Sequence, residues 1–500
     1  MRAAEYVFAF VRLARAKKVF GNPGTTELPL LRRIPGDIQY VLSLHDGLAV
    51  GMAEGAFLIS GRPQFVSLHG AIGLSNAIGY IRSALMDRAP LLVLVGQQHS
   101  EFLSDEPLIW GDILKIARPV VKDAFEVRTP IDVPKLLTRA LKVAVAPPWG
   151  PAVVSLPFDI VDEDVKESPA IPTFSFSILC EDSSVQEVAS WLTGGSKVAI
   201  VAGYEVDVYM AHEELRTLAE RISATVFAEP NAHRSPFYSS HPLFEGDLPW
   251  EADEMLKKLS VYDRILIVGG TLNFLTPPTE KDFKLNIFQV TSDPEEAEKR
   301  KWNTICCNVK EFLTKLNSAL PRSSISLKIE TERPKPVGTT IINFLEELAS
   351  NSQDREKFAE ASSLMGEIRR TMGYFPSRFF GLKSGLLGWS LTAAVGAALE
   401  GARPLVLIGD GGFHYSCQSL WTASNYGATE LRAVVFNNRG YEILRRHFRD
   451  EPWLSPLTSP YKVAEAYGVE AKKVGLKEAS KEISWLVRGK GPKLLQVDFA

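Results

Sequence analysis

The stretch that decides the fold is residues 408–438, IGDGGFHYSCQSLWTASNYGATELRAVVFNN. It opens at the end of an apolar run, continues through a helix-like segment at 416–426, and closes with a second apolar run at 431–436. In a parallel sheet, a strand, a helix and a strand in this order bring both strand ends to one edge, where α/β folds bind ligands. We therefore expect Asp410 and Asn438, which follow the two strands, to lie close together.

The polar residues at these strand ends suit a divalent cation and a phosphate group. Mg²⁺ takes oxygen ligands at about 2.0–2.1 Å, commonly one or two protein side chains together with phosphate oxygens and water. The Asp410 carboxylate and the Asn438 amide oxygen meet that requirement. Gly411 and Gly412 would let the main chain approach a phosphate, and the N-terminus of the following helix favours negative charge. A lone Gly-Asp-Gly is usually a tight turn, but its pairing with Asn-Asn at this spacing matches the signature of thiamine-diphosphate enzymes.

Outward from this stretch, the chain divides into three successive α/β blocks. Each block alternates short β-rich runs with amphipathic segments, which predicts a parallel sheet with helices on both faces. A polar stretch at 168–177 and a charged, proline-rich stretch at 328–338 are the expected boundaries. The predicted domains are 1–170, 180–325 and 335–500, each a doubly wound parallel sheet. The expected strands are 18–21, 39–44, 64–69 and 91–96, then 197–203, 224–228, 264–270 and 286–291, and finally 404–409, 432–437 and 493–498.

Composition limits the classes of partner. A chain of 500 residues with 45% hydrophobic content is too long for one core. A net charge of −3, from 56 basic and 59 acidic residues, leaves no broad footprint for nucleic acid or membrane, so a small molecule is the expected partner. The four cysteines form no C-x-x-C pair, which favours a reducing compartment, the cytoplasm, over a disulfide framework. The first 18 residues carry charges through their apolar positions and predict an amphipathic helix instead of a signal peptide.

Further motifs extend the likeness along the chain. They are FGNPGTTELP at 20–29, LHG at 68–70 followed by Asn76, FAEASS at 358–363 and GLLG at 385–388. With the Gly-Asp-Gly and Asn-Asn motifs, they make the sequence resemble the thiamine-diphosphate-dependent 2-oxo acid decarboxylases over essentially its whole length. The pattern is most similar to that of the benzoylformate decarboxylases.

The resemblance implies a role for each motif. Thr25 and His69 would orient the substrate, Leu387 would wedge under a bent cofactor, and Asp46 would hydrogen-bond the aminopyrimidine to activate it. The implied diphosphate contacts are Ser362, Ser363, Gly409, Gly411 and Gly412, and the implied metal ligands are Asp410, Asn438 and the main-chain oxygen of Gly440.

Two positions depart from the family's pattern. The activating carboxylate of the family is a glutamate, whereas this chain has Asp46, which is one methylene shorter and is also a good candidate for a helix N-cap. The middle block lacks the family's second catalytic histidine, whose position falls near Thr276. His414 and His447, beside the metal motif, are candidates to replace it.

The leading expectation is decarboxylation of a small or aromatic 2-oxo acid with thiamine diphosphate and Mg²⁺. The alternatives are carboligation, as in acetolactate synthase, and a cofactor-binding homologue with weakened catalysis. A nicotinamide dehydrogenase is disfavoured because Gly269-Gly270 lacks the full G-x-G-x-x-G fingerprint. The resemblance also implies a homodimer at least, and a tetramer is compatible with it.

Overall fold

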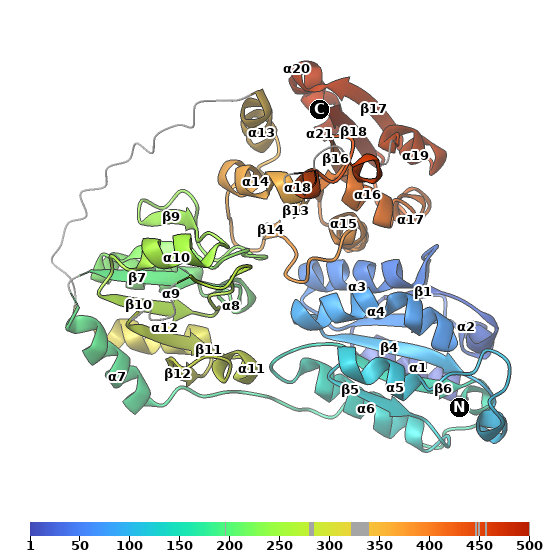
Figure 1. Ribbon diagram of the computed structural model, residues 1–500. Helices are drawn as coiled ribbons and strands as arrows, with labels where there is room; N and C mark the ends of the chain where they lie inside the picture. Colours follow the sequence, from blue (N-terminus) through green and yellow to red (C-terminus); the bar gives the residue numbers. More distant parts are fainter. Residues whose placement is uncertain are drawn as a thin grey trace. The chain divides into compact units, whose positions relative to one another are not determined.

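The described part of the chain folds into three six-stranded sheets and the helices around them. The structure is a computed structural model that describes residues 1–195, 197–279, 285–321, 340–445, 448, 451–455 and 458–499 (Figure 1). The chain forms two compact units, one of residues 1–175, 347–365 and 384–500 and the other of 176–346 and 366–383. Residues 168–181 contain no helix or strand, while the expected boundary at 328–338 lies outside the described residues. Within the described residues, no helix is both long enough and apolar enough to cross a membrane.

The N-terminal sheet has the strand order β2-β1-β3-β4-β6-β5, with parallel pairing. Its strand β4 (Leu91–Gln97) is buried at every position, as expected for a strand covered on both faces. Helices α1 (Ala3–Leu13) and α6 (Asp132–Val145) build an apolar core on one face, and α3 (Asp46–Ser60) and α4 (Gly70–Met86) pack on the other (Figure 1). The other elements are β1 (Lys18–Asn22), β2 (Gln39–Leu42), β3 (Gln64–Leu68), β5 (Asp123–Glu126), β6 (Ala152–Pro157), α2 (Leu28–Leu31) and α5 (Ile113–Ala117).

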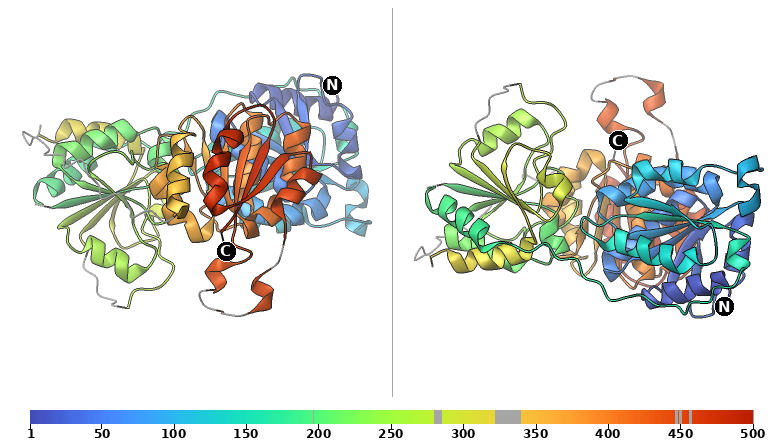
Figure 2. Two further views of the ribbon diagram at one scale, coloured as in Figure 1. Left: turned by 90° about the horizontal axis from the view of Figure 1, so that it is seen from above. Right: turned by 90° about the horizontal axis from the view of Figure 1, so that it is seen from below.

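The C-terminal sheet has the order β14-β13-β15-β16-β18-β17. Strand β15 (Leu405–Gly409) pairs in parallel with β16 (Arg432–Asn437), and helix α16 (Asp410–Ser416) begins directly after β15. Helices lie on both faces of this sheet (Figure 2). The other elements are β13 (Lys357–Glu360), β14 (Phe379–Phe380), β17 (Glu470–Gly475), β18 (Lys493–Asp498), α13 (Thr340–Ser350), α15 (Trp389–Leu399), α17 (Ser419–Asn425), α18 (Glu442–Arg445), α19 (Pro460–Ala466), α20 (Leu476–Ala479) and α21 (Ile483–Val487).

The middle sheet has the order β12-β11-β10-β7-β8-β9, so the strand order reverses between β7 (Val198–Ala202) and β10 (Arg264–Val268). Both strands are apolar and almost fully buried, because helices cover the two faces of the sheet (Figure 2). The other elements are β8 (Thr225–Ala228), β9 (Phe244–Asp247), β11 (Ile287–Thr291), β12 (Asn303–Cys306), α7 (Asp182–Thr193), α8 (Glu205–Val208), α9 (His212–Ile222), α10 (Ala252–Leu259), α11 (Pro294–Ala297) and α12 (Val309–Ala319).

The unit of the middle sheet also contains a segment from later in the chain, residues 366–383. This segment carries most of helix α14 (Met365–Met372) and strand β14. Nη2 of Arg369 donates to Oδ1 of Asn231 at 2.6 Å, and the hydroxyl of Tyr374 donates to Oδ1 of Asp247 at 2.8 Å. Polar side chains thus fix the segment to the unit of the middle sheet.

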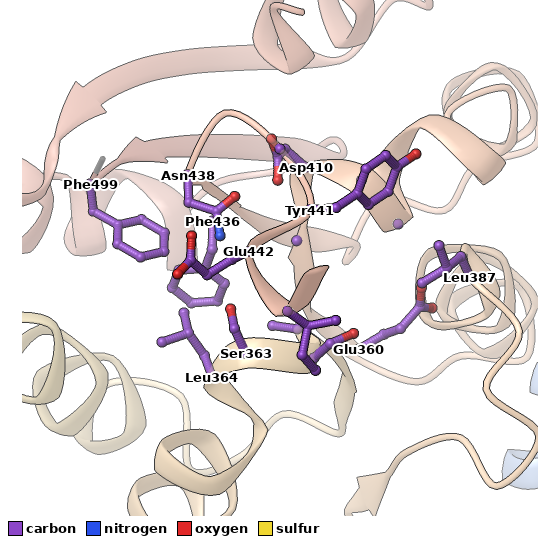
Figure 3. A pocket seen from close by; sticks show the side chains of 17 residues that line it. Glu360, Ser363, Leu364, Leu387, Asp410, Phe436, Asn438, Tyr441, Glu442 and Phe499 are labelled. Atoms are coloured by element: carbon purple, nitrogen blue, oxygen red, sulfur yellow. The ribbon is translucent and has the colours of Figure 1, made fainter. Parts of the chain in front are cut away.

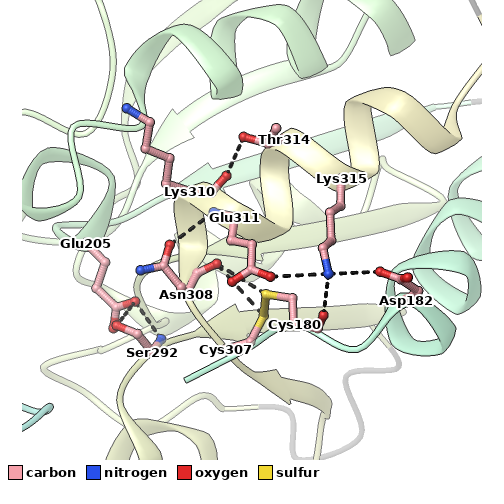
Figure 4. The surroundings of a disulfide bond; sticks show 10 residues. All are labelled: Cys180, Asp182, Glu205, Ser292, Cys307, Asn308, Lys310, Glu311, Thr314 and Lys315. Atoms are coloured by element: carbon pink, nitrogen blue, oxygen red, sulfur yellow. Dashed lines mark hydrogen bonds and ion pairs between the residues drawn. A yellow bond between two sulfur atoms is a disulfide. The ribbon is translucent and has the colours of Figure 1, made fainter. Parts of the chain in front are cut away.

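A disulfide joins Cys180 and Cys307 in the same unit (Figure 4). The prediction that the cysteines form no disulfide is therefore wrong for this pair, although Cys306 and Cys417 are free thiols. The two bonded residues are 127 positions apart, and they meet because one precedes α7 and the other follows β12, next to α12. Cysteine spacing along the sequence contains no signal of a contact that the sheet topology creates.

Helices α3 and α15 cross at two glycines within the unit of the N- and C-terminal sheets. A Cβ atom on Gly55 would lie 1.8 Å from the carbonyl oxygen of Ala393, and one on Gly396 would lie 1.8 Å from the carbonyl oxygen of Met52. Hydrogen at both positions is what allows the two backbones to approach. The crossing sets the spacing between α3, which begins at Asp46, and α15, which follows Gly388.

Candidate active site

A pocket that is partly open to solvent lies at the carboxyl ends of β13, β15 and β16, with about 510 Å³ of empty space when the open solvent at its mouth is included (Figure 3). Every residue that the sequence assigned to cofactor binding or to the metal lines it. These are Ser362, Ser363, Leu387, Gly409, Asp410, Gly411, Gly412, Asn438 and Gly440. The pocket also has an apolar side formed by Leu364, Phe436, Ile443 and Phe499.

Asp410 occupies the first position of α16 and is buried. Burial raises the pKa of its carboxyl group, while main-chain N–H groups of Gly411 and Gly440 donate to the carboxylate and act in the opposite direction. The residue expected to offer its main-chain oxygen, Gly440, thus adjoins the expected carboxylate ligand. Its φ of 148° lies in the region that glycine adopts most readily.

The two asparagines of the Asn-Asn motif have different partners. Nδ2 of Asn437 donates to Asp498 at 2.7 Å, so this side chain is bound to the end of the neighbouring strand β18. Oδ1 of Asn438 is buried and has no hydrogen-bond partner among the described residues. An unpaired buried acceptor is costly, and a cation would satisfy it.

The donor set limits which ion the pocket could take. Within the described residues, no cluster of three or more histidine, cysteine, aspartate or glutamate side chains could hold a metal. One carboxylate, one amide oxygen and a main-chain oxygen are hard ligands that suit Mg²⁺ when a diphosphate completes its shell, and they do not suit zinc. The pocket therefore fits a Mg²⁺–diphosphate group.

The loop that carries Leu387 is held by a buried carboxylate that the sequence analysis did not select. Glu360, at the end of β13, accepts hydrogen bonds from the main-chain N–H of Gly388 at 2.5 Å and of Ser390 at 2.9 Å. Burial raises its pKa to about 7, and the N–H donors of the loop oppose that shift. Gly388 adopts a φ of 89°, so Glu360 fixes a turn that glycine favours, directly after Leu387.

Asp46 is the first residue of α3 and is not its N-cap. The cap is His45, whose Nδ1 accepts from the N–H of Gly47 at 3.1 Å, so the alternative role considered for Asp46 is wrong. Oδ2 of Asp46 accepts from Asn76 at 3.3 Å, and Oδ1 is buried without a hydrogen-bond partner among the described residues. This free oxygen fits the role of an acceptor for a cofactor nitrogen.

His69 adjoins the same region of the fold. A Cβ on Gly73 would lie 2.4 Å from Oδ1 of Asp46 and 3.3 Å from Cβ of His69, so both residues lie against this glycine. Thr25 is exposed at the start of a short 3₁₀ turn, whereas the hydroxyl of the buried Thr26 lies 3.2 Å from Nδ1 of His69. The structure thus brings Thr26 to His69, and Thr25 stays a prediction for the substrate side.

Of the two histidines expected to replace the missing one, the structure describes His414 but not His447. His414 hydrogen-bonds the Thr458 hydroxyl, and burial lowers its pKa. His447 lies outside the described residues. Thr276 is exposed and forms an isolated β-bridge with Glu251.

Comparison with known proteins agrees with this geometry. The chain matches "Thiamine pyrophosphate enzyme, N-terminal TPP binding domain" over residues 1–115, the central domain of the same enzymes over 185–316, and their C-terminal TPP binding domain over 365–497. It is 31% identical to benzoylformate decarboxylase of Pseudomonas aeruginosa, with 92% of this chain and 91% of that protein covered. It is 23% identical to a probable acetolactate synthase large subunit of Methanocaldococcus jannaschii, with 95% and 88% covered.

Solved structures give the same result over the full length. Benzoylformate decarboxylase from Polynucleobacter necessarius superposes with a TM-score of 0.91 at 29% identity, covering 100% of this chain and 98% of that one. A thiamine diphosphate-dependent 4-hydroxybenzoylformate decarboxylase from Rhodococcus jostii RHA1 superposes with a TM-score of 0.93 at 27% identity, covering both chains fully. The chain belongs to the thiamine pyrophosphate enzyme family. Within that family it is a thiamine-dependent enzyme of the 2-oxo acid decarboxylase type, to which a carboligase activity is also open.

Proposed function

We propose that this protein decarboxylates an aromatic 2-oxo acid of the benzoylformate type, using thiamine diphosphate and Mg²⁺. The observation that carries the proposal is a pair of buried oxygens without hydrogen-bond partners among the described residues, Oδ1 of Asp46 and Oδ1 of Asn438. One is suited to the aminopyrimidine end of the cofactor and the other to the metal at its diphosphate end. The names of the relatives, two benzoylformate decarboxylases and a 4-hydroxybenzoylformate decarboxylase, support the aromatic acyl group.

When bound, thiamine diphosphate supplies a carbon nucleophile and an electron sink that the protein itself lacks. Asp410, Asn438 and the main-chain oxygen of Gly440 would hold the metal ion. Ser362 and Ser363 would donate hydroxyl hydrogen bonds to the diphosphate. The residues that would let main chain approach its oxygens are Gly409, Gly411 and Gly412.

The remaining residues would activate the cofactor and orient the substrate. Asp46 would form a hydrogen bond to N1′ of the aminopyrimidine, and would so hold and activate that ring. Leu387 would press on the cofactor from a loop that Glu360 holds in place. His69 and Thr25 would orient the carboxylate and the carbonyl of the substrate, which lowers the barrier by fixing the reacting atoms.

The proposal also covers the oligomeric state of the protein and its location in the cell. We propose a homodimer at least, with a tetramer also compatible, because the family forms its site between subunits. A cytoplasmic location stays a prediction, and the Cys180–Cys307 disulfide requires that this pair remain oxidised there.

The test is release of carbon dioxide from a panel of 2-oxo acids, with thiamine diphosphate and Mg²⁺ supplied, beside a calorimetric titration of cofactor binding. Benzoylformate and 4-hydroxybenzoylformate should be turned over faster than pyruvate. Cofactor binding without release from any acid would refute decarboxylation and leave the catalytically weakened homologue. Absence of cofactor binding would refute the site itself.

Carboligation is the second candidate, and the absence of a histidine near Thr276 favours it. A site that cannot deliver a late proton gives a second carbonyl compound more time to react. Product analysis separates the two activities, since a decarboxylase releases an aldehyde and a carboligase releases a 2-hydroxy ketone.

A further inference from the structure

Glu27 is a buried carboxylate next to His69 that neither the motif analysis nor the proposed mechanism uses. Its side chain is 1% exposed, and it accepts four hydrogen bonds. Oε2 accepts from the N–H of Gly24 at 2.9 Å and lies 3.0 Å from Nδ1 of His69. Oε1 accepts from the hydroxyl of Thr26 at 2.6 Å and from the N–H of Gly70 at 3.2 Å. The carboxylate therefore joins the 20–29 loop to the start of α4.

Two glycines make room for this arrangement. A Cβ on Gly96, in β4, would lie 1.8 Å from Oε1 of Glu27. A Cβ on Gly24 would lie 1.8 Å from Nδ1 of His69. Neither position can accept a side chain while the carboxylate and the imidazole ring stay in place, so both glycines leave space that these two groups occupy.

The contact determines which nitrogen of His69 carries a proton. A carboxylate only accepts hydrogen bonds, so Nδ1 must be the donor at 3.0 Å. Free imidazole of a histidine prefers the other form, with the proton on Nε2. No hydrogen bond to Nε2 is made by another described residue, and the His69 side chain is 27% exposed, so a ligand could reach this nitrogen. Neutral His69 would therefore present an unprotonated Nε2.

We propose that Glu27 is a positioning residue that holds His69 as the Nδ1-protonated tautomer and leaves Nε2 to face the substrate. The inference rests on the proposed role of His69 in substrate orientation. At many histidine sites, a carboxylate that hydrogen-bonds one ring nitrogen fixes the tautomer of the ring in this way. The rival reading is that Glu27 only ties together two loops through Gly24 and Gly70.

The first test measures the tautomer without any turnover. The full-length protein, labelled with ¹⁵N at its eight histidines, is examined by long-range ¹H–¹⁵N NMR at a pH where His69 is neutral, and the His69→Gln variant assigns the signal. The native protein should show His69 with Nδ1 protonated, and a proton on Nε2 would overturn the proposal. In Glu27→Ala the signal should move toward the Nε2-protonated form, and an unchanged Nδ1 pattern would overturn it too.

A matched control and a second variant keep the test decisive. Glu205→Ala removes another buried carboxylate with several hydrogen bonds, in the unit of the middle sheet, and should leave the His69 signal unchanged. A change in that control would mean that general destabilisation moves the signal, and would overturn the proposal. If Glu27→Ala does not fold, Glu27→Asp withdraws the carboxylate from Nδ1 and should shift the tautomer in the same direction; an unshifted signal there counts against Glu27.

The second test is a kinetic cycle, which separates this inference from the proposed function. With an active substrate, Glu27→Ala should lower kcat/KM by about tenfold or more in the native background. In the His69→Gln background the same substitution should have almost no effect, because a residue that acts through His69 has nothing left to position. Equal losses in both backgrounds would overturn the proposal. If no substrate is found, the proposed function fails, while the NMR result still decides the role of Glu27.

Discussion

The crossing of α3 and α15 gives a stringent test of the packing, through the substitution Gly396→Ala. The added Cβ would lie 1.8 Å from the Met52 carbonyl oxygen, whereas real Cβ atoms essentially never come within 3.0 Å. The helices would have to separate by about 1.2 Å, the difference between these distances, and the obstructing atoms are backbone with no side chain that could turn away. Overpacking of this kind costs about 1–3 kcal/mol, which outweighs the gain of up to about 1 kcal/mol from replacing a helical glycine.

The measurement is the Tm of the cofactor-free protein by calorimetry at fixed protein concentration, since ligands and association shift Tm. We expect Gly396→Ala to lower Tm by about 2–8 °C, at roughly 2–4 °C per kcal/mol. Gly366→Ala is the control, because this exposed glycine of α14 has nothing within 4 Å of its Cβ position, and its Tm should stay equal or rise slightly. A Tm for Gly396→Ala at or above that of the native protein would refute the tight crossing. Separated helices should also weaken thiamine diphosphate binding, since the two helices start at Asp46 and just after Leu387.

Four other changes have expected outcomes. Asp46→Ala should slow exchange of the cofactor's C2 proton by at least about tenfold, or 1.36 kcal/mol, as measured by quenched-flow NMR; an equal rate would leave Asp46 without a part in activation. Asp410→Ala should abolish Mg²⁺-dependent cofactor binding in calorimetry, and an unchanged affinity would exclude it as a metal ligand. Burial raises the pKa of Glu229 from 4.5 to about 7, so the folded state binds the proton more tightly than the unfolded state, and the free energy of unfolding should fall by up to about 3 kcal/mol as the pH rises between these values. The substitution Glu229→Gln removes this titration and should make the fall smaller, as measured by unfolding curves at pH 5 and pH 8. An equally steep fall in that variant would contradict the shift. Reducing the Cys180–Cys307 disulfide, which closes a loop of 127 residues, should destabilise its unit by about 5 kcal/mol in the chain-entropy account, and a thermal unfolding transition unchanged by dithiothreitol would argue against it.

The sequence was sufficient for the parts of the fold that depend on local pattern. Buried strands such as β4 and β15 are continuous apolar runs, because a sheet covered on both faces needs no alternation. The Gly-Asp-Gly and Asn-Asn motifs predicted which residues meet in one pocket, because each lies at a strand end of the same unit. The strand β17 was missed, since an edge strand that contains Lys472 and Lys473 lacks an apolar signature.

The features that the sequence did not reveal depend on tertiary partners. In the sequence, nothing distinguishes Glu27 and Glu360 from other glutamates, because only the folded chain brings main-chain N–H donors to each carboxylate. The role of His45 as the cap of α3 could not be separated from that of Asp46, because adjacent residues can each begin a helix. The disulfide likewise arises from topology, which brings together two residues that no spacing rule connects.

The position of residues 366–383 constrains how such chains can be recombined. Arg369 and Tyr374 come after the middle domain in the sequence, yet their hydrogen bonds are made to Asn231, just after β8, and to Asp247, at the end of β9. A chimaera that exchanged the middle domain as one continuous block would separate these partners and leave buried polar groups unmatched on both sides of the junction. A workable exchange must therefore transfer two pieces of chain, and the second piece ends four residues before Leu387. Inheritance of the middle domain is in this way tied to a segment that ends just before the loop of Leu387.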